Sequence, residues 1–594
     1  MCGIAGLMTR DGSPPSDAQL RALARALVHR GPDGEGRVIA GGVGLAQTRL
    51  AIIDLETGDQ PLYAPLDGGG KAALVANGEI YNYVELKLDM GRVRFATRSD
   101  CEPPLHLYLR HGLNFVRHLR GMYAIAIHDP AEDCLVLARD PFGIKPLYYT
   151  ETPTGFAFAS EPQAIIKVGL VKPEIDTQSL GELLQMQFTT GRRTPFAGIE
   201  RLLPGETVTV RRGRVADRLR RPALPAEGPA DISRTTALHR LDTLLNDSVG
   251  IHQRSDVPYG MFLSGGVDSS VLLAMMARLN ERPVKAFTAG FDGAGVADER
   301  DHARAVATAA RAEHREVSFG EGDFWALLPE IAAAMDDPAA DYATLPTYKL
   351  AAEAKKAGLK VVLTGEGGDE LFGGYGRYRR ARRARFLGGR PMRAKGVFDG
   401  LDVLRRIPAG WRDGFAEHER EAAAGGRTQL QAAQATDCAD WLPNDLLTKL
   451  DRCLMAHGVE GRVPFLDVRV AEFALTLPDR LKVRRGFGKW LLRRWLETGM
   501  PAAKPFSAKR GFTVPVGEWI GGRGGELGPL VASQPAIDEI CAPPAVEALF
   551  RAAGPGRGRR AGQAAWVLLF YALWHRRHVQ GLKPEGDVFD ALAA

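Results

Sequence analysis

Cysteine is scarce in this chain, and the cysteines present form no familiar pattern. The 594 residues include six, at positions 2, 101, 134, 438, 453 and 541, and none has C-x-x-C spacing. Disulfide frameworks and zinc sites depend on closely and regularly spaced cysteines. We therefore expect neither, and we expect a protein that works in a reducing cytoplasm. We predict buried, packed thiols at Cys101, Cys134, Cys438, Cys453 and Cys541.

Long apolar runs and a strong excess of one charge are also missing. The longest apolar run, Ala564–Trp574, is shorter than the roughly 18–20 residues that a membrane-spanning helix needs. It predicts a buried helix segment instead. The N-terminus has no basic region before an apolar stretch, so we expect no secretory signal and no membrane partner. The net charge is only +6, which does not argue for a nucleic-acid partner.

The first 210 residues predict antiparallel sheets. Short apolar runs such as Met122–Ile127 and Cys134–Ala138 alternate with Gly, Pro and Asp turns. Two helices, Ser16–Val28 and Glu102–His111, are expected between them, the first capped by Ser16. Residues 211–232 are rich in Arg, Pro and Gly and predict a linker.

Residues 233–594 predict a second, larger domain. Strands are expected at Val257–Leu263, Val284–Phe291 and Lys360–Thr364, and helices at Ser269–Leu279 and Thr347–Ala357. Alternation of strands and helices predicts a parallel sheet covered by helices. Beyond residue 440 the chain is expected to be mainly helical. The arginine-dense segment Arg377–Arg385 predicts a solvated helix face, with an acidic partner or a second copy of the chain as the alternative.

Cys2 directly follows the initiator methionine. If the methionine is removed, one residue carries both a thiol and an α-amine, and the amine has an unperturbed pKa of about 7.7–8.0. Such an amine can activate the thiol as a nucleophile. Four further segments accompany it: His29–Asp33, Arg49–Asp54, Asn77–Asn82 and Ser99–Glu102. In order and spacing these segments resemble the glutaminase domain of class II glutamine amidotransferases, N-terminal-nucleophile hydrolases with a four-layered αββα sandwich.

The resemblance implies roles for these residues in glutamine hydrolysis. Cys2 would be the nucleophile, and the Asn77 side chain and Gly78 N–H would form the oxyanion hole. The planar Arg49 fork suits the glutamine α-carboxylate. The remaining glutamine-binding residues implied by the resemblance are Leu50, Ile52, Ile53, Glu79 and Asp100, with Asp100 on the α-ammonium.

The segment Ser264–Ser270, with the sequence SGGVDSS, lies between a predicted strand and a predicted helix. Glycines allow close approach to an anion, and the helix N-terminus points N–H groups at it. The Gly-Lys-Ser/Thr ending of a P-loop is missing. The segment resembles the loop of N-type ATP pyrophosphatases, which cleave ATP to AMP and pyrophosphate. A second Gly-rich loop, Thr364–Tyr375, carries several carboxylates. Asp268 and Asp369 are the candidates for holding Mg²⁺ beside phosphate oxygens.

Together with Gly458–Asp467 and Gly488-Lys489, these loops resemble the synthetase domain of the asparagine synthetase family. The resemblance implies ATP contacts from Leu263, Ser264, Gly265, Gly266, Asp268, Ser269, Ala289, Thr364 and Gly365. It implies that Glu366 takes part in forming an acyl-adenylate and that Lys489 stabilises charge on the phosphates. The expected acceptor-binding residues are Asp369, Glu370, Tyr375, Arg452, Glu460 and Arg462.

The resemblance as a whole implies an ATP-dependent ligase that amidates aspartate with nitrogen from glutamine. Ammonia released at Cys2 would travel through an intramolecular tunnel to a β-aspartyl-AMP intermediate, and glutamate, AMP and pyrophosphate would be released. Tyr342 stands where an acceptor-binding arginine is expected. The same mechanism acting on a peptide, a sugar acid or another small acid therefore stays open as an alternative. An amidotransferase making an amino sugar would not need the SGGVDSS loop. A homodimer is a further alternative to a single chain.

Overall fold

The computed structural model describes residues 2–291, 299–381, 391–406, 409–507, 514–554 and 559–593. The N-terminal part, residues 2–220, is called the first half below, and the part from residue 234 onward is called the second half. The first half contains two six-stranded sheets, and every strand pairing in them is antiparallel. The first sheet has the order β10 (Glu200–Arg201), β8 (Tyr148–Thr152), β9 (Gly155–Ala159), β1 (Gly3–Thr9), β3 (Val43–Arg49) and β2 (Gly34–Ala40). The second has the order β12 (Arg214–Arg220), β11 (Glu206–Arg211), β7 (Cys134–Arg139), β6 (Gly121–Asp129), β5 (Lys71–Ile80) and β4 (Leu62–Pro65).

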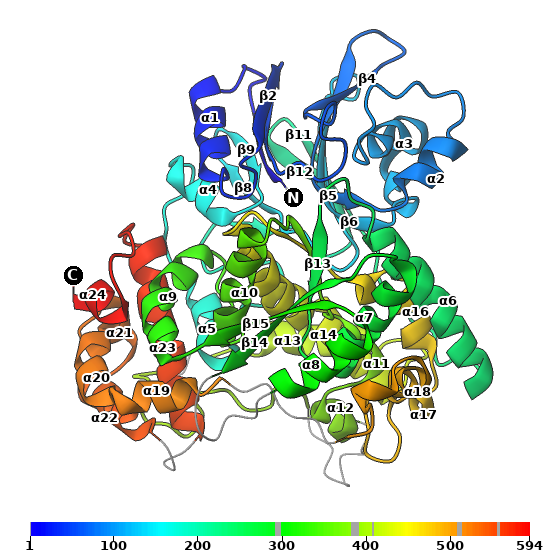
Figure 1. The fold of residues 1–594 in the computed structure, drawn as a ribbon. Coiled ribbons are helices and arrows are strands. Elements are labelled where there is room, and N and C mark those ends of the chain that lie inside the picture. Colours follow the sequence, from blue (N-terminus) through cyan, green and yellow to red (C-terminus); the bar gives the residue numbers. More distant parts are fainter. Residues whose placement is uncertain are drawn as a thin grey trace.

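The two sheets pack face to face on an apolar core. Ile4 and Leu45 of the first sheet lie in one buried cluster with Val75, Ala126 and Leu135 of the second. Helices α1 (Asp17–Ala26) and α4 (Pro162–Lys167) pack on the first sheet, and α3 (Pro103–His111) packs on the second beside α2 (Tyr83–Asp89). This arrangement confirms the predicted αββα sandwich (Figure 1).

The segment predicted as a linker is partly a strand, which corrects its first boundary. Arg214–Arg220 forms β12, which pairs with β11 along the edge of the second sheet. Most of its side chains are exposed. An edge strand that faces water carries polar residues, so its sequence resembles that of a connection.

The second half contains a five-stranded sheet in which every pairing is parallel, as predicted. Its order is β15 (Glu313–Phe319), β14 (Lys285–Phe291), β13 (Tyr259–Phe262), β16 (Val361–Leu363) and β17 (Glu460–Arg462). The chain leaves β13 toward β14 and β15, and later returns to β16 on the opposite side of β13. The carboxyl ends of β13 and β16 therefore meet at a topological switch point, where such sheets bind ligands.

Helices surround this sheet and make up the C-terminal part, as predicted. Helix α5 (Thr177–Met186) belongs to the first half. The first helices of the second half are α6 (Arg234–His252), α7 (Val267–Leu279), α8 (Arg300–Ala309), α9 (Glu321–Ala334), α10 (Thr344–Lys356), α11 (Gly368–Phe372) and α12 (Gly376–Ala381). The next are α13 (Asp413–Ala422), α14 (Gln429–Ala439), α15 (Thr448–Met455), α16 (Val468–Thr476), α17 (Asp479–Lys482) and α18 (Trp490–Gly499). The last are α19 (Val516–Gly522), α20 (Gly524–Ala532), α21 (Pro535–Ile540), α22 (Pro543–Ala552), α23 (Arg559–His578) and α24 (Val588–Ala593).

The apolar run Ala564–Trp574 is the buried centre of α23, as predicted. Trp566 Nε1 donates to Ala340 O at 2.6 Å and Trp574 Nε1 donates to Met335 O at 2.8 Å. This helix therefore supports the loop between α9 and α10. No helix in the described ranges combines the length and the apolar character needed to cross a bilayer. The two halves share one continuous core, and the N-terminal end lies at their junction (Figure 1).

Candidate active sites

Cys2 lies immediately before β1, where the two sheets of the sandwich meet. Its main-chain N donates to Asn77 Oδ1 at 3.1 Å, which ties β1 of the first sheet to β5 of the second. The thiol is buried, and burial raises its pKa. A main-chain hydrogen bond from Leu50 and the charge of Arg49 act in the opposite direction. The structure thus brings Cys2 together with three residues predicted for the same site.

Asn77 has the geometry of an oxyanion donor. Its Oδ1 is occupied by Cys2, whereas its Nδ2 is buried and has no hydrogen-bond partner among the described residues. A buried donor without a partner is costly unless a ligand satisfies it. The next residue, Gly78, has φ = +150°, and a β-carbon there would lie 2.0 Å from Met122 O. Only glycine can bring its main chain into this position beside Asn77.

The charged residues predicted for the same site lie at the end of β3 and beside β5. Arg49 ends β3, and its Nη1 pairs with the exposed Asp59 at 2.7 Å. Asp100 is buried and accepts a hydrogen bond from Ile80 N at 2.7 Å. Burial raises the pKa of Asp100 and raises that of Glu79 well above the ordinary value. Leu50, Ile52 and Ile53 follow β3 and are buried.

The SGGVDSS loop connects β13 to the N-terminus of α7, as predicted. Ser264 Oγ lies 3.0 Å from Ser269 Oγ and accepts from Gly266 N at 3.2 Å. Gly265 has φ = +70°. Leu263 and Ala289 lie at the carboxyl ends of neighbouring strands β13 and β14. Thr364 and Gly365 follow β16, so the predicted nucleotide contacts converge on the switch point.

Lys489 joins the two loops. Its Nζ pairs with Asp268, and it lies 2.7 Å from Asp369 Oδ1. Burial alone would lower the pKa of Lys489, but the two carboxylates raise it above its ordinary value. A β-carbon at Gly368 would lie 2.6 Å from Asp268 Oδ1, and one at Gly374 would lie 1.8 Å from Asp369 Oδ1. Glycine at both positions leaves the carboxylates room against the main chain.

This pair of carboxylates fits a magnesium ion that completes its shell with phosphate oxygens and water. Mg²⁺ is usually held by one or two carboxylates together with substrate phosphates. The described ranges contain no group of three or more His, Cys, Asp or Glu side chains able to form an all-protein cage. Asp268 and Asp369 would therefore be its only protein ligands of that kind here.

Glu366 lies in the same loop, and its surroundings include a lysine that sequence reasoning missed. Burial raises the pKa of Glu366, and the Lys449 ammonium is the strongest opposing charge. Lys449 Nζ pairs with Asp341 at 3.0 Å. Asp341 precedes α10 and Lys449 lies on α15, more than 100 residues apart, so no local motif could have linked them.

Asp369, Glu370 and Tyr375 remain together as candidates for the acceptor. Tyr375 Oη donates to Glu370 Oε1 at 2.7 Å. Burial and the neighbouring Asp369 raise the pKa of Glu370 to about 8. Arg377 stacks on Tyr375 and pairs with Asp437 at 2.7 Å, so it does not lie on a solvated face, whereas Arg379 and Arg380 of the arginine-dense segment are exposed as predicted. Residues 382–385 of that segment lie outside the described ranges.

The other three predicted acceptor residues have partners elsewhere. Arg462 pairs with Glu460 at 2.6 Å and lies 3.4 Å from Glu79 of the first half. Arg452 pairs with Asp336 at 2.7 Å and with Asp451 at 2.8 Å. Both guanidinium groups are almost completely buried. The structure thus gives them places at the junction of the two halves.

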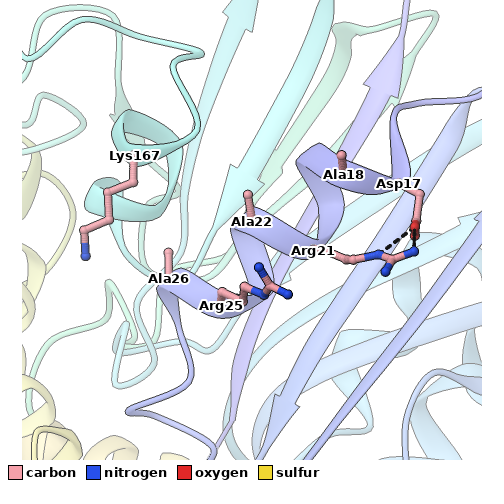
Figure 2. Close-up of a pocket in the computed structure, with 7 residues that line it drawn as sticks. All are labelled: Asp17, Ala18, Arg21, Ala22, Arg25, Ala26 and Lys167. Carbon is pink, nitrogen blue, oxygen red and sulfur yellow. Dashed lines mark hydrogen bonds and ion pairs between the residues drawn. The ribbon is translucent and has the colours of Figure 1, made fainter.

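A surface hollow of about 630 Å³ differs in its lining from the two candidate sites. Its lining is the outer face of α1 together with Lys167 (Figure 2). Ala18, Ala22 and Ala26 alternate there with Arg21 and Arg25. It contains no nucleophile and none of the predicted site residues.

Comparison with known proteins agrees with this division into two sites. Residues 1–220 match the glutamine amidotransferase domain family, and residues 240–576 match the asparagine synthase family. The chain is 34% identical to a putative glutamine-hydrolysing asparagine synthetase of Mycobacterium tuberculosis, over 98% of both chains. It is 33% identical to glutamine-hydrolysing asparagine synthetase 1 of Bacillus subtilis, over 88% of both. It is also 28% identical to the amidase chry2 of Gibberella zeae, over 88% of this chain and 90% of that one.

Proposed function

The chain belongs to the family of glutamine-hydrolysing asparagine synthetases, and on this basis we propose how its two sites work. It is an enzyme that uses glutamine as amido donor and ATP to make asparagine. The observation that carries the proposal is the buried Asn77 Nδ2, which has no described partner and lies on the residue that holds Cys2. The six cysteines are buried free thiols, which suits a reducing cytoplasm.

At the first site, the Cys2 thiol gives its proton to the Cys2 α-amine that removal of Met1 would expose, and the sulfur attacks the carboxamide carbon of glutamine. The α-amine then passes the proton to the departing nitrogen. Negative charge develops on the carboxamide oxygen, and Asn77 Nδ2 and Gly78 N–H donate hydrogen bonds to it. Donors fixed in advance stabilise such an oxyanion because they need no reorganisation during the reaction. Ammonia leaves, and water then hydrolyses the Cys2 thioester to glutamate. Arg49 and Asp100 hold the α-carboxylate and the α-ammonium.

At the second site, the acceptor carboxylate attacks the α-phosphorus of ATP and pyrophosphate leaves. The loop at the N-terminus of α7 binds the departing phosphates through main-chain N–H groups. Lys489 neutralises charge that develops on them. Mg²⁺ bound by Asp268 and Asp369 would add charge neutralisation on the phosphate oxygens. Ammonia then attacks the acyl-adenylate carbon, and AMP is displaced.

The ammonia passes between the sites inside the protein. Glu79 follows the oxyanion residues in β5 and lies 3.4 Å from Arg462 in β17. Arg462 O in turn accepts from Thr364 N at 2.8 Å, and Thr364 begins the loop that carries Glu366. A single strand therefore separates the glutamine site from the loop that holds the acyl-adenylate, which supports direct transfer.

Aspartate is the acceptor that the family favours. Lys449 is the cation beside Glu366, and it can pair with the carboxylate of aspartate that is not activated. The place expected for an arginine is taken by Tyr342, which is partly buried against the core. Because the acceptor side differs there, amidation of another small acid is the second candidate.

A product assay distinguishes the two candidates. With ATP, Mg²⁺, glutamine and aspartate, we expect one pyrophosphate and one asparagine for each turnover. Other carboxylic acids, tested singly in place of aspartate, should release little pyrophosphate. Release with another acid but none with aspartate would reject aspartate as acceptor. Absence of glutamate formation from glutamine would reject the amidotransferase itself.

A further inference from the structure

A buried arginine connects the main chain of Cys2 to the synthetase half. Arg30 is completely buried, and its Nε donates to Cys2 O at 3.3 Å. Its Nη1 and Nη2 donate to the two carboxylate oxygens of Asp451, at 2.7 and 2.9 Å. Asp451 lies on α15, in the second half. The guanidinium that contacts the nucleophile residue is thus held, through two hydrogen bonds, by the other half.

The two hydrogen bonds to Asp451 fix the orientation of the Arg30 guanidinium. A carboxylate that accepts two parallel N–H bonds fixes the plane of a guanidinium, whereas a single contact does not. The remaining charged partner, Glu161, receives one bond from Nη1 at 2.8 Å. Burial would raise the pKa of the Asp451 carboxyl, but Arg30 lowers it below the ordinary value, so the pair stays ionised.

Asp451 is itself fixed within the second half. Arg452 Nη1 donates to Asp451 Oδ2 at 2.8 Å, and Arg452 Nε donates to Asp336 Oδ1 at 2.7 Å. The same helix carries Lys449, which pairs with Asp341 near Glu366. One short helix therefore contacts the surroundings of both sites.

We infer that Asp451 is a positioning residue of the glutaminase, supplied by the synthetase half. Through Arg30 it holds the Cys2 main chain where the thiol faces the Asn77 and Gly78 donors. Glutamine hydrolysis then reaches its full rate only when the first half is docked on α15. This inference rests on the proposed glutamine hydrolysis at Cys2 and names the residue of the second half on which it depends.

The test is Asp451→Asn in the full-length enzyme. Asparagine retains the shape of the side chain but loses the charge and one acceptor for the Arg30 fork. We expect the glutaminase kcat to fall by about 10- to 100-fold, because small displacements of a reacting group have effects of this size. The KM for glutamine should change little, since Arg49 and Asp100 are untouched. Synthesis driven by added ammonium should stay near the unmodified rate.

The matched control is Glu85→Gln. Glu85 in α2 also makes a two-bond ion pair across the junction, with Arg254 at 2.7 and 2.6 Å, but it lies at the surface. We expect this variant to retain its glutaminase kcat.

Asp451→Glu keeps the charge and should recover more activity than Asp451→Asn. The inference fails if Asp451→Asn hydrolyses glutamine normally, if Asp451→Glu is as slow as Asp451→Asn, or if glutamine- and ammonia-driven synthesis fall together. Lack of glutaminase activity in the unmodified enzyme would instead reject the proposed function.

Discussion

Replacement of Cys2 by alanine is expected to abolish glutamine-driven synthesis and to leave ammonia-driven synthesis intact. Removal of the thiol takes away the group that forms the thioester in the proposed mechanism. Loss of a nucleophile in other hydrolases costs several orders of magnitude, so we expect a fall of about 10³-fold or more in glutaminase kcat. The second site, built on β13 and β16, does not include Cys2. Both reactions can be followed as asparagine formed, with glutamine or with ammonium as nitrogen source.

Cys134→Ala is the matched control, because Cys134 is another buried thiol of the same half, located in β7. It should retain glutaminase activity. Equal loss of glutamine- and ammonia-driven synthesis in Cys2→Ala would contradict separate sites, provided the thermal unfolding midpoint is unchanged.

Replacement of Lys489 by methionine is expected to slow synthesis with either nitrogen source and to leave glutamine hydrolysis intact. The ammonium lies between Asp268 and Asp369. Without it the two carboxylates repel each other, and the charge on the phosphates loses its protein cation. Loss of one such preorganised charge typically costs about 10²- to 10³-fold in rate. We expect this fall in pyrophosphate release with either nitrogen source, while glutamine hydrolysis measured without ATP persists.

Lys349→Met provides the comparison for Lys489. Lys349 on α10 also pairs with a carboxylate, Asp323, at 2.6 Å, but it is no part of the two loops. It should release pyrophosphate at the unmodified rate. Normal pyrophosphate release by Lys489→Met would remove the lysine from the phosphate site.

Local sequence was sufficient for the parts of the fold and the sites that depend on neighbouring residues. The SGGVDSS loop could be placed because a strand, a Gly-rich turn and a helix follow one another directly in the sequence, and β13 and α7 confirm that order. Ser16 caps α1, accepting from Gln19 N, as its position predicted. Short apolar runs separated by turns also predicted antiparallel strands in the first 210 residues, whereas their arrangement as a two-sheet sandwich was implied by the family resemblance.

What could not be predicted depends on pairings between distant residues or on water-facing strands. Arg452 and Arg462 stay predictions for the acceptor site, but their ion-pair partners Asp336 and Glu79 could not be predicted because they come from other parts of the chain. Lys449 was missed because its place beside Asp341 exists only after folding. The edge strand β12 has mostly exposed side chains, so its sequence carries no apolar run and suggested a linker.

The central claim is that nitrogen passes from Cys2 to the acyl-adenylate without leaving the protein. The most direct measurement is asparagine synthesis from ¹⁵N-amide glutamine in a large excess of unlabelled ammonium, with the ¹⁵N content of the product amide read by mass spectrometry. The account predicts that the amide keeps most of the label of the glutamine. An amide whose label is diluted to the level of the ammonium pool would contradict it.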